Sequence, residues 1–266
     1  MARYCPLFSG SEGNCTYIGN ADGGILIDAG VSAKRIETAL CERGIDPHRI
    51  AAVFVTHEHA DHVSGLRVLT RRYGMRVYAT GGTMEALAAA DRLDAAVDCR
   101  VLTPDSSRGI AEGGCLIAAF STPHDSRQSC GYRIHTADGR RVAVATDMGV
   151  MTDTVRAAIT GCELIQIESN HDVELLRRGP YPDFLKRRIL ARTGHLANAA
   201  CAAELCRLAQ NGASRFVLAH LSRKNNRPEL AYETARTALA AGGLIEQVDY
   251  LLRVAAPIDQ AGVTVF

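Results

Sequence analysis

The chain of 266 residues consists of two stretches that follow the same order of apolar and amphipathic segments. Each stretch begins with three short apolar runs separated by turn residues, at 4–8, 15–19 and 23–30 in the first and at 114–122, 130–137 and 140–149 in the second. Such runs predict strands that pair as antiparallel neighbours. Because strands and helices then alternate in both stretches, we expect two sheets packed face to face, with helices outside.

The later segments of each stretch carry the alternation. We expect strands at 50–56, 75–80, 163–169 and 215–222 and helices at 32–45, 64–74, 83–93, 151–162, 172–179, 182–192, 196–212 and 228–243, followed by β-like segments. No linker or low-complexity segment separates the halves. The pattern therefore predicts a single domain over residues 1–266, of the α/β (α+β) class.

Composition excludes several classes of protein. No apolar run approaches the roughly 20 residues that a bilayer requires, so no membrane association is expected. The nine cysteines are scattered singly and no secretory h-region is present at the N-terminus, which favours reduced thiols and a cytoplasmic location. A net charge of +1 gives no global attraction to nucleic acid, so any polyanion must be bound by a local patch.

The segment "VTHEHADH" at 55–62 places three histidines and two carboxylates directly after an apolar strand. It is not a helical HExxH zinc motif, because Asp61 stands where the second histidine would be. Histidine is the commonest metal ligand near neutral pH. A loop that leads from a strand into a helix can point His57 and His59 to one side and Asp61 and His62 to another, which suits two metal ions.

Further candidate ligands follow three other strands. His124, Asp147 and His220 each come just after an apolar run. A lone histidine in such a place is more often a hydrogen-bonded structural residue. Sites in open α/β sheets are commonly built at the carboxyl ends of strands, however, and four strand ends with matching ligand types favour a shared metal site.

In this order, the residues resemble the metallo-β-lactamase superfamily, whose signature is Asp, HxHxDH, His, Asp and His; the chain has Asp28, His57-x-His59-x-Asp61-His62, His124, Asp147 and His220. The resemblance implies a four-layer αβ/βα sandwich. It also implies two divalent cations, with Zn²⁺ preferred and Mn²⁺ or Fe²⁺ possible. The first cation is assigned to His57, His59 and His124, the second to Asp61, His62 and His220, and Asp147 bridges them.

A narrower resemblance is to the WalJ/YycJ group of DNA exonucleases. It rests on "SGSEGNC" at 9–15, "ESNHD" at 168–172, "GHLAN" at 194–198 and "HLSRKNNRPELA" at 220–231, although Ala197 replaces the usual Ser. The likeness to ribonuclease Z and to the phosphodiesterase PhnP is looser. Together, these resemblances imply a phosphodiesterase that uses a hydroxide shared by two cations. The WalJ/YycJ group favours an exonuclease. The alternatives are a hydrolase of a small cyclic or nucleotide phosphodiester and a thioester or lactone hydrolase.

Several residues receive roles beside the metals. Asp61 is assigned to catalysis as well as to metal binding. His195 and His171 are the candidate proton donors, with His195 preferred, although "SNHD" also fits a helix N-cap. Asp28 is expected to orient a ligand histidine, and Glu168 to pair with one of the candidate donors. Glu58 either faces outward or supports the loop.

The substrate is read from basic residues. A run on two predicted helices comprises Arg177, Arg178, Lys186, Arg187, Arg188 and Arg192, which is either a phosphate track or a solvated face. The predicted substrate-binding residues are Arg223, Lys224, Asn225, Arg227 and Asn198. Tyr181 is the one candidate for base stacking. The expected partner is a nucleic acid, DNA in preference to RNA, and the oligomeric state is left open.

Overall fold

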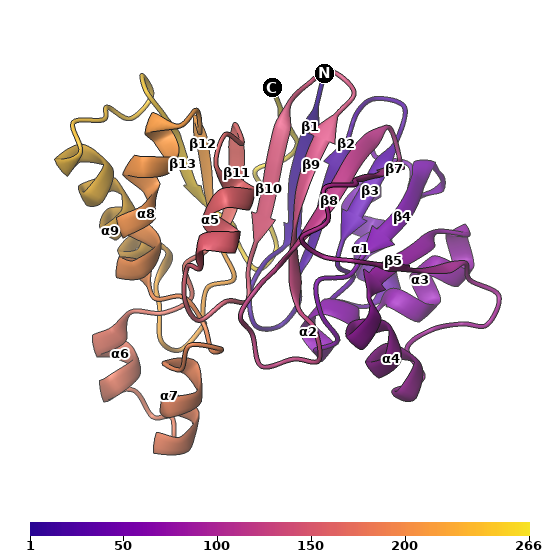
Figure 1. Cartoon of the computed structure of the whole chain (residues 1–266), viewed down its shortest axis with the longest axis horizontal. Coiled ribbons are helices and arrows are strands. Elements are labelled where there is room, and N and C mark those ends of the chain that lie inside the picture. The colour runs from indigo at the N-terminus through magenta and orange to yellow at the C-terminus, as the bar shows by residue number, and fades with distance from the viewer.

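The computed structural model describes residues 1–266 and contains two seven-stranded sheets packed face to face (Figure 1). The first sheet has the order β14-β1-β2-β3-β4-β5-β6, with bounds Thr264–Val265, Arg3–Phe8, Cys15–Gly19, Gly24–Ile27, Ile50–Phe54, Arg76–Thr80 and Cys99–Leu102. The second has the order β13-β12-β11-β10-β9-β8-β7, with bounds Leu251–Val254, Arg215–Ala219, Leu164–Glu168, Arg141–Ala145, Cys130–Thr136, Cys115–Ser121 and Ile110–Glu112.

The two sheets share one pairing pattern. Strands β14, β1, β2 and β3 are antiparallel neighbours and β3 to β6 are parallel. In the second sheet β7 to β10 are antiparallel and β10 to β13 are parallel. Each half thus has an antiparallel meander followed by strand–helix–strand crossovers, as the sequence pattern predicts.

Helices cover both outer faces (Figure 1). The first half carries α1 (Ala33–Cys41), α2 (Ala60–Val63), α3 (Leu66–Tyr73), α4 (Gly81–Ala89) and a 3₁₀ turn (Pro47–Arg49). The second carries α5 (Asp153–Ile159), α6 (Val173–Arg178), α7 (Asp183–Ile189), α8 (Asn198–Gln210) and α9 (Pro228–Ala241). The α6–α7 pair stands away from the other helices, below the second sheet in Figure 1.

Strand periodicity explains the layers. In β3, Ile25 and Ile27 pack into the core between the sheets, whereas Leu26 between them packs under the helices of the first half. Phe54 in β4 and Tyr132 in β9 meet in that central core, edge to face at 5.6 Å. A third core lies under α5, α8 and α9. The predicted four-layer sandwich is therefore confirmed.

Three short elements were not expected from the sequence. Strand β6 has Arg100 and Val101 exposed, so it lacks the continuous apolar run that marks a buried strand. Strand β7 has only three residues and α2 only four. Such segments are fixed by their neighbours rather than by their own pattern. No helix in the structure combines the length and apolarity needed to cross a bilayer.

Candidate metal centre

The segment 57–62 follows β4 and is fixed by a buried carboxylate on the neighbouring strand. Asp28 follows β3 and accepts hydrogen bonds from the Thr56 backbone N–H at 2.8 Å and from the Thr56 hydroxyl at 2.9 Å. Its Oδ2 also lies 2.8 Å from Nδ1 of His62. This contact leaves Nε2 of His62 facing the Asp61 and Asp147 carboxylates, which is compatible with the orienting role expected of Asp28.

The backbone of segment 57–62 is also clamped from the first hairpin. The N–H of Asn14 donates to the Asp61 carbonyl at 2.8 Å, and the Asn14 carbonyl accepts from Gly30 at 2.8 Å. A Cβ on Gly30 would lie 1.7 Å from that same Asp61 oxygen. Since no side chain fits there, glycine is required for the approach of the two segments.

The second half contributes one residue after each of three strands: His124 after β8, Asp147 after β10 and His220 after β12. Asp147 and His220, like Asp28 in the first half, have left-handed backbones, with φ of 59°, 56° and 63°. Residues with side chains rarely adopt this conformation, and it concentrates at functional sites. His220 is held in it by Ser9, which accepts from its N–H at 2.9 Å, and by Asn170, which donates to its carbonyl at 2.8 Å.

The structure brings the predicted ligands into two adjoining groups. The possible ligand atoms of His57, His59 and His124 lie within 4.8 Å of one another, and so do those of Asp61, His62 and His220. The Asp147 carboxylate reaches both groups, because it is 3.4 Å from Nε2 of His62 and 3.8 Å from Nε2 of His124. Asp147 thus occupies the position between the groups that a bridging ligand requires.

The donor set fits divalent cations. Nε2 of His57 and Oδ2 of Asp147 are buried and have no hydrogen-bond partner within the protein. Buried polar atoms are normally satisfied, so unpaired atoms that face one point call for a bound group. Imidazole nitrogen with carboxylate oxygen suits borderline divalent metals such as Zn²⁺.

Burial and neighbouring charges shift the pKa values in this cluster. Burial lowers the pKa of His57 well below its ordinary value, so the ring is neutral. For His220, burial opposes charging, but the carboxylates of Asp147, Asp61 and Glu168 together outweigh it and raise the pKa to about 10. Metal ligation requires a neutral imidazole, so a cation that binds His220 must displace a proton.

His195 and Glu168 form a pair beside the ligands. Nδ1 of His195 lies 2.7 Å from Oε1 of the fully buried Glu168, whose other oxygen accepts the Met148 N–H at 2.9 Å. Burial opposes charging of His195, but the Glu168 and Asp147 carboxylates together outweigh it and raise the pKa of the ring. His171 does not line the pocket over the ligands: it is 1% exposed, and burial lowers its pKa to about 4.

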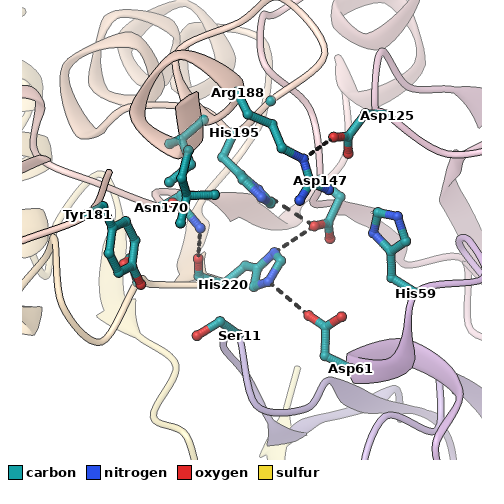
Figure 2. A pocket seen from close by; sticks show the side chains of 14 residues that line it. Ser11, His59, Asp61, Asp125, Asp147, Asn170, Tyr181, Arg188, His195 and His220 are labelled. Atoms are coloured by element: carbon teal, nitrogen blue, oxygen red, sulfur yellow. Dashed lines mark hydrogen bonds and ion pairs between the residues drawn. The ribbon is translucent and has the colours of Figure 1, made fainter. Parts of the chain in front are cut away.

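A pocket of about 230 Å³ opens over the ligands (Figure 2). Its polar side includes His59, Asp61, Asp147, His195 and His220. The opposite side is provided by the α6–α7 pair and its connection, through Tyr181, Leu185, Arg188 and Ile189. Figure 2 shows Tyr181 across the pocket from His59, and Arg188 joined to Asp125.

The predicted substrate-binding residues lie elsewhere than on this wall. Asn198 and Asn225 are 3% and 0% exposed, and Asn198 bonds to Ser169 and Asn226 in a buried network. Arg223 pairs with Glu12 and lines a neighbouring hollow. Lys224 contacts the pocket indirectly, because its ammonium lies 5.6 Å from the Tyr181 ring centroid. Arg227 is an exposed residue at the start of α9.

Sequence reasoning missed several residues that complete the site. Asn14 lies in the glycine-rich "SGSEGN" turn, which carried no signal of its contact with the Asp61 carbonyl. Asp125 directly follows His124 but carried no signal of its pairing with Arg188. Glu58 accepts the Arg127 N–H at 2.8 Å and so supports the loop, one of the two roles expected of it.

This geometry agrees with comparisons to known proteins. Residues 24–221 match the family described as "Beta-lactamase superfamily domain", and the chain belongs to that family. It is 35% identical over 248 residues to a Streptococcus pneumoniae protein named exodeoxyribonuclease WalJ, and the match covers 93% of this chain and 92% of the relative. It is 34% identical over 242 residues to a Bacillus anthracis protein named exodeoxyribonuclease YycJ, which covers 91% and 90%.

Solved structures share the fold at low identity. The metallo-β-lactamase fold protein YhfI from Bacillus subtilis superposes with a TM-score of 0.73 at 15% identity, and the match covers 100% of both chains. The short form of human tRNase Z gives a TM-score of 0.64 at 17% identity and covers 99% and 98%. The resemblance predicted from the ligand pattern is confirmed.

Proposed function

We propose that this protein is a metal-dependent phosphodiesterase that removes nucleotides from the ends of DNA. The observation that carries the proposal is the position of Asp147, which lies between two groups of three ligand residues. A carboxylate there, where lactam-cleaving members of the superfamily usually have cysteine, favours phosphodiester chemistry. The names of the S. pneumoniae and B. anthracis relatives support DNA as the substrate.

The ligands would hold two divalent cations, with Zn²⁺ preferred and Mn²⁺ or Fe²⁺ as alternatives. Bound there, the cations supply activation of the attacking water and neutralise charge on the phosphate oxygens. His57, His59 and His124 would hold one, Asp61, His62 and His220 the other, and Asp147 both. We place the protein in the cytoplasm, where its nine free cysteines would remain reduced.

The remaining side chains position the substrate and move a proton. Glu168 fixes Nδ1 of His195, so Nε2 of that ring is available to donate a proton to the departing oxygen. Arg188 lines the pocket and keeps its terminal nitrogens available, because only its Nε is bonded to Asp125. A guanidinium in that place can contact a phosphate oxygen.

The test is a degradation assay on DNA and RNA oligonucleotides blocked at the 5′ or the 3′ end, run with Zn²⁺, Mn²⁺ and Fe²⁺. We expect stepwise loss of nucleotides from one unblocked DNA end, abolished by chelation and by Asp147→Ala. Turnover that survives Asp147→Ala contradicts the two-cation arrangement. Hydrolysis of a small cyclic diester, a thioester or a lactone, with DNA intact, contradicts the assignment of substrate.

A further inference from the structure

The wall of the pocket that faces the ligands comes from two short helices in one crossover. Between β11 and β12 the chain forms α6 and α7 before it reaches α8, and residues 173–189 are called the arm below. Only Leu176 and Ile189 of its helical residues are buried. The arm therefore adds little to the core. Its main contribution is the apolar side of the pocket.

The arm is nevertheless held at both of its ends. The N–H of Asp172 donates to the Asn225 carbonyl at 2.9 Å, and a Cβ on Gly179 would lie 2.8 Å from the Asn225 side-chain oxygen. At the other end, Arg188 pairs with Asp125, the neighbour of His124. These contacts attach the arm to two loops that carry candidate ligands, so Tyr181 keeps a fixed place relative to the metal centre.

Tyr181 presents an aromatic surface to the cavity. It lines the pocket, whereas Lys224, whose ammonium lies 5.6 Å from the ring centroid, does not. The cation–π contact with Lys224 helps to fix the orientation of the Tyr181 ring. Leu185 and Ile189 continue the apolar surface beside it.

The size and chemistry of the cavity select its occupant. Its volume of about 230 Å³ lies below the range of about 300–1,000 Å³ that is usual for small-molecule pockets, so the part of a substrate that enters it is small. One side offers metal ligands and Arg188 for a phosphate, and the other an aromatic ring with aliphatic neighbours for a planar base.

We infer that the arm forms a stacking subsite for one unpaired nucleotide at a DNA end, with Tyr181 under the base and Arg188 on the phosphate. The inference rests on the proposed phosphodiesterase function and makes Tyr181 a specificity-determining residue for it. The substrate end is then single-stranded or frayed by one pair, and any base is accepted because every base has a face that can stack.

The test combines enzyme variants with changes in the substrate end. Single-stranded DNA carries either a normal terminal nucleotide or an abasic tetrahydrofuran at the end that is degraded. Base–aromatic stacking of about 1–3 kcal/mol per base predicts that the abasic end lowers kcat/KM of the native enzyme about 5- to 150-fold. Tyr181→Ala should cause the same loss on normal DNA, mainly through KM, and no further loss on the abasic end.

Two matched variants complete the design. Tyr181→Phe keeps the ring and should behave like the native enzyme. Phe184 is 67% exposed on the same arm and does not line the pocket, so Phe184→Ala should leave kcat/KM within about twofold. If Tyr181→Ala lowers cleavage of normal and abasic ends equally, or if the native enzyme cleaves both ends equally well, the stacking subsite is refuted.

A binding measurement separates this inference from the proposed function. The chain has no tryptophan, so fluorescence of 2-aminopurine at the DNA end is read without protein background. Quenching by the native protein and by Phe184→Ala, but not by Tyr181→Ala, supports the subsite even if no DNA is cleaved. Absence of cleavage together with this quenching pattern would refute only the proposed nuclease activity. Equal fluorescence with all the variants refutes the subsite even if cleavage is observed.

Discussion

The first half of the molecule supplies four candidate ligands from one six-residue segment, 57–62, whereas the second half supplies three from the ends of three strands. In the first half the ligands are held by the Asn14 backbone, which bonds to the Asp61 carbonyl and to Gly30, and by the Asp28 carboxylate, which contacts His62. In the second half each ligand depends on the alignment of its own strand. Two similar sheets thus position the ligands in two different ways. The single segment of the first half depends on a few close contacts.

The largest effect should come from the tightest of those contacts. Gly30→Ala would place a Cβ 1.7 Å from the Asp61 carbonyl and force segment 57–62 out of position. We expect a loss of about 3 kcal/mol in the free energy of unfolding, measured by denaturant titration, together with loss of bound metal. The control is Gly81→Ala, because a Cβ there meets nothing nearer than 3.8 Å; equal losses would show that segment 57–62 is not held by close packing.

A smaller effect should follow when the orienting carboxylate of the first half is changed. Asp28→Asn keeps the shape but weakens the contact with Nδ1 of His62. Loss of such a partner typically lowers metal affinity about 10- to 100-fold, which a competition titration with a chelator measures. Asp46→Asn, on the exposed cap of the 3₁₀ turn, should leave affinity unchanged. Unchanged affinity in Asp28→Asn would remove Asp28 from the site.

The second half should show the stronger response to acid through His171. Burial lowers its folded pKa to about 4, against about 6.5 in an unfolded chain, so the unfolded state binds the proton first. Stability from this group is complete above about pH 6.5 and is lost as the pH falls toward 4. The loss is at most about 2 kcal/mol between pH 7 and pH 5.

Urea unfolding of chelator-treated protein at these two pH values measures that loss. His171→Gln should remove this part of the pH dependence, and His48→Gln, at an exposed position, should retain it. A native pH dependence in His171→Gln would show that the buried ring is already protonated or hydrated in the folded state.

The smallest effect concerns the contact between the halves. Glu58 in the first half accepts the N–H of Arg127 in the second, and Glu58→Ala removes one hydrogen bond. We expect Glu58→Ala to lower the free energy of unfolding by about 1 kcal/mol and to retain metal binding. The control Glu85→Ala, at an exposed position, should leave the free energy of unfolding unchanged. Loss of metal in Glu58→Ala would mean that Glu58 maintains the ligand geometry itself.

Sequence reasoning located the ligands because each follows a recognisable apolar strand, and parallel strand ends meet at one edge. His57 to His62 form a local motif, and Asp147 and His220 follow strands that pair through β11 in the same sheet. Side-chain contacts across the pocket could not be predicted from the strand pattern. Asn225 looked like a substrate contact but is buried, and the pairing of Arg188 with Asp125 joins residues 63 positions apart.

The left-handed backbones at Asp147 and His220 have a consequence for how such a chain changes over time. At these positions the backbone alone favours glycine over any residue with a side chain by about 1 kcal/mol. If activity ceased to matter, substitutions to glycine there would ease the backbone while they removed the ligands. The metal centre can therefore be lost through mutations that leave the sandwich folded, so a descendant could keep this architecture and have no catalytic chemistry.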